Sequence, residues 1–235
     1  MLLQQVVPLH DEASVYAWLE DEILSGRLAP GAPVNLDALA EQRAVSRLEM
    51  REAASRLAAD GLAAVSESGA VLRVSPVSLA DLNDLTATRI VVETEALRQS
   101  IAVGDGGWED QVRSAFERLS AVEPLLMENP RDFLGEWEHC NEAFHAGLTA
   151  ACPLRRLMDF NKRLYKQHQR YRRLALLGRR GRRDVHAEHL ALFEAAMARD
   201  AATASQVLAA HIGATVDQLA NGIREGSWFG VPDNG

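Results

Sequence analysis

The sequence predicts a mainly α-helical chain with one small β-hairpin, divided into domains at residues 8–76 and 78–226. Three observations support this. Apolar residues recur at helical spacing through most of the 235 residues. A strand-like pattern is found at residues 62–74, where two short apolar runs flank a turn rich in serine and glycine. From Ser78 onward the pattern is helical throughout, without a repeat.

The elements of the first domain follow from their end signals. A helix is expected over residues 11–26, ended by a glycine and a Pro-Gly turn. A short helix over residues 35–42 begins at Asn35. The next helix begins at Ser46, because Ser-Arg-Leu-Glu is a capping box, and it ends at Gly61.

Two strands, residues 62–65 and 71–74, complete a winged helix-turn-helix with a β-hairpin wing. The second helix of a helix-turn-helix lies in the DNA major groove, with its first residues near the base edges. Arg47 and Arg51 lie on the first two turns of this helix, opposite the apolar positions Met50, Ala54 and Leu57. Guanidinium groups suit guanine edges and phosphates.

A solvated helix face is the alternative for these arginines. The chain has a formal net charge of -8, and residues 10–76 contain eleven acidic residues against six arginines. A surface coated in basic charge is therefore excluded, although a local basic patch is not. The sequence pattern alone does not decide between DNA binding and a solvated helix face.

The second domain is expected to be an all-α bundle. The expected helices span residues 79–102, 108–122, 131–150, 154–177, 184–198 and 201–224, with breaks that include Pro124. The sequence contains no P-loop, GxGxxG, GxSxG or HExxH motif. We therefore expect the chain not to be an enzyme.

Histidine spacing in this bundle predicts a metal site. His189 and His211 are each eleven residues from Asp200, so in an antiparallel hairpin they lie at the same height. Asn141 and His145 share one helix face. Three imidazoles and one oxygen donor suit a divalent metal ion, zinc or nickel.

Unrelated histidines are the alternative to a metal site. His186 lies one turn from His189 and could be mistaken for a metal ligand. The arginine-rich segment 179–184 is expected to be a solvated loop, with a contact to the DNA backbone or to a partner subunit as the alternative. For Arg89 and Glu93, the alternative is an exposed ion pair.

The first domain resembles the GntR family of bacterial transcription regulators. The resemblance rests on the Ile-Leu-x-Gly-x-Leu-x-Pro-Gly turn, Leu-Ala-Glu, Val-Ser-Arg-x-x-x-Arg-Glu-Ala and Leu-x-x-x-Gly-Leu. The family usually has Thr-Pro where this chain has Leu48-Glu49, which implies a different operator sequence. The resemblance implies operator contacts by Arg43, Ser46, Arg47, Glu49, Arg51 and, at the wing tip, Gly69.

The second domain resembles the FCD ligand-binding domain of FadR-like members of that family. The matching residues are Arg89–Glu93, Asn141–His145, Glu188-His189 and His211-Ile212. The resemblance implies that Asn141, His145, His189 and His211 hold the metal, and that Arg89 binds the carboxylate of a small organic acid effector. Asn141 replaces a more common aspartate, which removes one negative charge.

Together these features predict a cytoplasmic, homodimeric transcription regulator, a repressor or an activator, that binds double-stranded operator DNA. The sequence shows no signal peptide and no membrane-spanning run, and its two cysteines have no metal-like spacing. A metal-dependent enzyme and a metal-free regulator of the acyl-CoA-binding kind are the alternatives. The effector, the operator and the regulated genes are not identified by the sequence.

Overall fold

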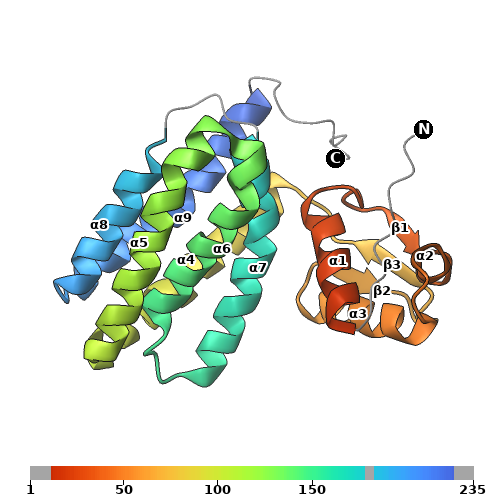
Figure 1. The fold of residues 1–235 in the computed structure, drawn as a ribbon, viewed down its shortest axis with the longest axis horizontal. Helices are drawn as coiled ribbons and strands as arrows, with labels where there is room; N and C mark the ends of the chain where they lie inside the picture. Colours follow the sequence, from red (N-terminus) through yellow and green to blue (C-terminus); the bar gives the residue numbers. More distant parts are fainter. Residues whose placement is uncertain (1–11, 178–182, 225–235) are drawn as a thin grey trace. The chain divides into compact units, whose positions relative to one another are not determined.

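The computed structural model describes residues 12–177 and 183–224 (Figure 1). The chain divides into two compact units. One contains the residues up to Asp81 together with Lys166–Arg173, and the other contains Leu82–Tyr165 and the residues from Leu174 onward. The expected domain limits at residues 8 and 226 lie outside the described residues.

The N-terminal unit packs three helices against a three-stranded antiparallel sheet of order β1-β3-β2 (Figure 1). Its elements are α1 (Glu12–Leu24), β1 (Pro33–Asn35), α2 (Leu36–Arg43), α3 (Arg47–Ala59), β2 (Ala63–Val65) and β3 (Val71–Val74). The expected hairpin is present as β2 and β3. Strand β1 was not expected, because three residues that begin with proline carry no alternating pattern.

Both expected helix starts are confirmed. The Asn35 side chain accepts a hydrogen bond from the Ala38 amide at 2.9 Å and caps α2. At α3, Ser46 Oγ accepts from the Glu49 amide at 3.1 Å, while the Glu49 carboxylate accepts from the Ser46 amide at 3.0 Å. The reciprocal box satisfies amide groups that a helix start leaves without partners, so it fixes where α3 begins.

The C-terminal unit is a helical bundle, as predicted (Figure 1). Its described helices are most of α4 (Leu79–Val103), α5 (Gly106–Glu128), α6 (Pro130–Thr149), most of α7 (Arg155–Leu177), α8 (Val185–Met197) and α9 (Ala201–Arg224). Helix α5 packs against α6 and α8, and α8 packs against α9. Leu119, Phe144, Leu192 and Leu208 are among the fully buried side chains of this core.

The expected break at Pro124 is wrong, because α5 continues through it to Glu128. Proline removes one backbone hydrogen bond and costs about 3 kcal/mol inside a helix. Val122 and Leu126, on either side of Pro124, are both buried in the bundle core. Burial of a large apolar side chain contributes about 1.5–3 kcal/mol, so two such residues offset the cost of the proline.

Within the part of the chain that the structure describes, no helix has both the length and the apolar character needed to cross a bilayer.

Candidate metal centre and DNA-binding helix

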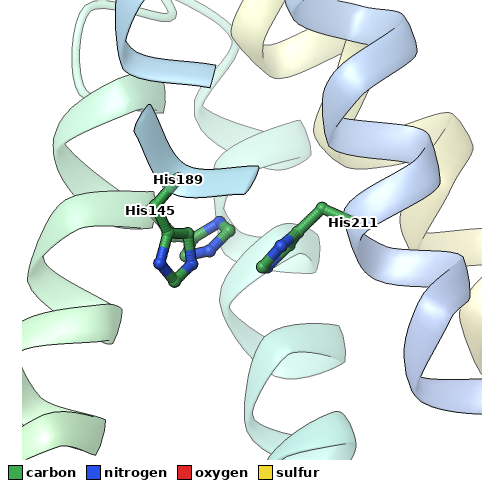
Figure 2. Close-up of side chains that lie close together, drawn as sticks. All are labelled: His145, His189 and His211. Atoms are coloured by element: carbon green, nitrogen blue, oxygen red, sulfur yellow. The ribbon is translucent and has the colours of Figure 1, made fainter. Parts of the chain in front are cut away.

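Three histidines from three helices meet inside the C-terminal bundle (Figure 2). His145 lies on α6, His189 on α8 and His211 on α9, and their potential ligand atoms all lie within 4.8 Å of one another. The α8–α9 hairpin turns at Asp200, so the equal spacing of His189 and His211 places them together as expected. His145 and His189 are buried, and the side chain of His211 is 13% exposed.

Each of these imidazoles contacts its own glutamate through Nδ1. His145 Nδ1 lies 3.1 Å from Glu93 Oε1. His189 Nδ1 lies 2.5 Å from Glu123 Oε1 on α5, and His211 Nδ1 lies 2.7 Å from Glu188 Oε2 on α8.

The Nε2 atom of His189 is buried and has no hydrogen-bond partner among the described residues. Leaving a buried polar atom without a partner costs free energy, so such an atom calls for an explanation. Neutral imidazole nitrogens grouped in this way are suitable ligands for a divalent metal ion. The residues present therefore fit a metal site.

The electrostatics of the cluster favour neutral imidazoles. Burial lowers the pKa of His145 to about 4, although the neighbouring Glu93 carboxylate acts in the opposite direction. Burial and the other two histidines also lower the pKa of His211. Burial alone would raise the pKa of Glu93, but Arg89 and His145 outweigh it and lower this pKa to about 2. Neutral imidazole is the form that binds metal, so His145 and His211 need no deprotonation step near neutral pH.

Asn141, the expected fourth ligand, lies one turn before His145 on α6 and is buried. Its Nδ2 donates to the Tyr165 hydroxyl at 2.6 Å. Its Oδ1 is buried and has no hydrogen-bond partner among the described residues. The amide is thus held by its nitrogen, and its oxygen remains available. Its role as a ligand stays a prediction.

Arg89, the expected effector residue, lies on α4 and is 3% exposed. Its Nε and Nη2 donate to Glu93 Oε2 at 3.1 and 2.6 Å, and its guanidinium carbon lies 5.2 Å from the centre of the Tyr165 ring. The alternative of an exposed ion pair is therefore wrong. Because Glu93 contacts both Arg89 and His145, it links the arginine to the histidine cluster.

The sequence did not indicate Arg183, and the expectation of a solvated loop is wrong at this residue. Arg183 donates to both carboxylate oxygens of Glu188, at 2.8 and 2.6 Å, and to the backbone oxygen of His211 at 2.7 Å. Residues 179–182 of that segment lie outside the described residues.

The role of Glu123 also went unrecognised, because its partner His189 is 66 residues away and no local pattern links them. The other carboxylate oxygen of Glu123 lies 2.6 Å from His186 Nδ1, and the side chain of His186 is 50% exposed. His186 is therefore outside the three-histidine cluster but attached to it through Glu123.

In the N-terminal unit, the two faces of α3 are divided as predicted. Met50, Ala54 and Leu57 are completely buried, whereas Arg47 is exposed. Leu48 is 66% exposed, which is unusual for a large apolar side chain and places it on the same accessible turn as Arg47.

Two of the selected arginines have partners within the N-terminal unit. Arg51 Nη2 donates to both carboxylate oxygens of Asp37 on α2, at 2.9 and 3.2 Å. Arg43 lies with its guanidinium carbon 4.3 Å from the Trp18 ring centre.

Ser46 and Glu49 form the cap of α3, and Gly69 lies in the wing between β2 and β3. Gly69 has a φ of +68°, in the left-handed region that favours glycine. A Cβ atom at this position would meet nothing within 4 Å. The backbone conformation of the turn therefore favours glycine here, and there is free space around the wing tip.

Comparison with known proteins identifies both parts of the chain. Residues 12–72 match the bacterial regulatory proteins of the gntR family, and residues 84–214 match the FCD domain. The chain is 40% identical over 198 residues to the uncharacterized HTH-type transcriptional regulator BphR of Paraburkholderia xenovorans, covering 84% of this chain and 80% of that protein. It is 30% identical over 202 residues to the HTH-type transcriptional repressor GlaR of Escherichia coli, covering 84% and 90%.

Solved structures show the same fold. E. coli McbR/YncC has a TM-score of 0.69 at 20% identity, covering 92% of this chain and 99% of that one. A putative GntR regulator from Rhodococcus has a TM-score of 0.68 at 21% identity, covering 89% and 97%. The relatives are named as transcriptional regulators and not as enzymes. The chain belongs to the GntR family and is a DNA-binding transcriptional regulator with an FCD domain.

Proposed function

We propose that the chain is a cytoplasmic, homodimeric repressor whose C-terminal domain binds a divalent metal ion and a small organic acid. In this proposal, the effector bound in the FCD domain changes how tightly the N-terminal domains hold operator DNA. Repression is proposed from the relative GlaR, which is named as a repressor.

The proposed DNA contacts are made by the first turn of α3, by α2 and by the wing. Arg47 is exposed on that turn, next to a helix N-terminus that itself attracts phosphate. Arg43, Ser46, Glu49, Arg51 and Gly69 complete the proposed surface. A two-fold dimer would present two such surfaces to two half-sites of the operator.

The histidine cluster is the observation that supports the metal proposal. Three buried or nearly buried imidazoles converge within 4.8 Å, and each contacts a carboxylate. We propose His145, His189 and His211 as ligands, with Asn141 Oδ1 as the fourth. Zinc and nickel are the proposed ions because both accept imidazole ligands.

The effector proposal rests on Arg89 and the metal together. A divalent ion held by neutral ligands supplies positive charge that a carboxylate oxygen can neutralise. Glu93 connects Arg89 to this cluster, because it contacts both Arg89 and His145. A guanidinium is suited to bind carboxylates. A small molecule with at least one carboxylate is therefore the proposed effector.

Elemental analysis of protein purified without chelator tests the metal proposal. We expect about one zinc or nickel ion per chain in the parent, and loss of the ion in His189→Ala and His211→Ala. His139→Ala is the matched control, because His139 is exposed on α6. A parent that stays empty after supplementation with either metal would favour the metal-free, acyl-CoA-binding alternative.

A further inference from the structure

A second layer of side chains surrounds the histidine cluster, and it follows one pattern. Each histidine contacts a glutamate, and each of those glutamates contacts a second basic side chain. Glu93 is bound by Arg89, Glu188 by Arg183 and Glu123 by His186. Four different elements supply these six residues: α4, α5, α8 and the segment before α8.

We propose that Glu93, Glu123 and Glu188 are positioning residues that fix the proton of each cluster histidine on Nδ1 and leave Nε2 as the metal-binding atom. The inference rests on the proposed metal site. The chemical reason is that an ionised carboxylate can only accept hydrogen bonds, so a neutral imidazole facing it must donate from Nδ1. The contacts are close enough for this, at 3.1, 2.5 and 2.7 Å. At His211 the Glu188 contact is shorter than the one from Arg183 Nη2, which lies 3.3 Å from the same Nδ1 and can only donate.

The isolated Nε2 atom of His189 supports the same conclusion. With Nδ1 bonded to Glu123, the only other nitrogen of this fully buried ring has no partner among the described residues. Proton placement on Nδ1 makes that nitrogen a lone-pair donor. Metal-bound histidines in other proteins commonly donate their second N–H to a carboxylate, and this partner raises the basicity of the ring.

Glu123 is the most informative of the three glutamates. It contacts two histidines, one through each oxygen, and it is 5% exposed. Water cannot readily replace it, in contrast to Glu188, whose side chain is 28% exposed. His186 holds the outer oxygen of Glu123 and stacks on Phe116, with ring centres 6.3 Å apart. We therefore expect the largest effect from changes at Glu123 and a smaller effect from His186→Ala.

The first test observes the proton directly. In metal-free parent protein labelled with nitrogen-15 in its histidines, long-range proton–nitrogen NMR should place the proton of His145, His189 and His211 on Nδ1. In Glu123→Ala, the signal of His189 should change to the Nε2–H form, while those of His145 and His211 stay unchanged. Nε2–H signals for all three rings in the parent would overturn the proposal.

The second test measures zinc and nickel affinity by competition with a chelating dye. Glu123→Ala should raise Kd by about 100-fold and Glu123→Gln, which keeps an acceptor but not the charge, by about 10-fold. Glu117→Gln is the matched control, because Glu117 is exposed on the same helix. Melting curves of each metal-free variant serve as the control for folding. Equal Kd values in folded Glu123→Ala and the parent would refute the positioning role.

The two tests separate this inference from the metal proposal. If the parent shows Nδ1–H tautomers but binds neither metal, the proposed metal function fails and the assignment of the proton stands. If the parent binds metal and folded Glu123→Ala binds it equally well, the metal function stands and the positioning role fails.

Discussion

Acid should destabilise the metal-free protein because His145 is buried without a charge. Its pKa is lowered from 6.5 to about 4 in the folded chain. Between these values the unfolded chain takes up a proton that the folded chain does not. The free energy of unfolding is therefore at its full value above pH 6.5, and it decreases as the pH falls toward 4.

The size of this effect follows from the shift. Each pKa unit corresponds to about 1.36 kcal/mol, so His145 alone accounts for a loss of about 3 kcal/mol between pH 7.5 and 4. Between pH 7.5 and 5 the loss is about 2 kcal/mol. This upper range lies above the ordinary pKa of glutamate, so Glu93 does not contribute to it. His211, whose pKa is also lowered, adds to the loss in the same direction.

Equilibrium urea unfolding in the presence of a chelator measures this dependence. We expect His145→Leu to reduce the slope of unfolding free energy against pH between 7.5 and 5. His139→Leu should not, because His139 is exposed on the same helix. An unchanged slope in His145→Leu, or a parent that becomes more stable toward pH 5, would refute the reasoning.

The other predictions concern the arginines that are proposed to bind DNA or the effector. Arg47→Ala should weaken operator binding by about 1–3 kcal/mol without a change in melting temperature, and a gel-shift titration at fixed salt that shows parent-like affinity would contradict this. Asp37→Asn should strengthen operator binding several-fold in the same assay, because it frees Arg51 and removes a negative charge; weaker binding would count against a DNA contact by Arg51. Arg89→Lys should keep the buried positive charge beside Glu93 but lower affinity for small carboxylates about tenfold by calorimetry, and equal affinity would remove Arg89 from the effector site.

Local signals explain what the sequence could predict. The starts of α2 and α3 were predictable because Asn35 and Ser46 act on residues three positions away. The meeting of His189 and His211 was also predictable, since a tight antiparallel hairpin converts equal sequence distance from Asp200 into equal height. In both cases the partner is set by local geometry.

The remaining features depend on long-range packing. Strand β1 exists because β3 offers it an edge, and α5 passes through Pro124 because the bundle core holds both of its flanks. Glu123 meets His189 across 66 residues, and Arg183 meets His211 across 28. No spacing rule covers such pairs, so the sequence could predict the histidine cluster but not the carboxylates that orient it.

The two arginine–carboxylate pairs differ in how easily a ligand could replace the carboxylate. Arg51 and Asp37 are 43% and 30% exposed, so their pair contributes about 0–1 kcal/mol and a DNA phosphate can displace Asp37. Arg89 and Glu93 are 3% and 2% exposed, and separating a buried pair costs about 3–5 kcal/mol. We therefore expect DNA to take Arg51 away from Asp37, whereas an effector has to bind Arg89 while Glu93 stays in place. Because Glu93 also contacts His145, an effector that did displace it would disturb the proposed metal site at the same time.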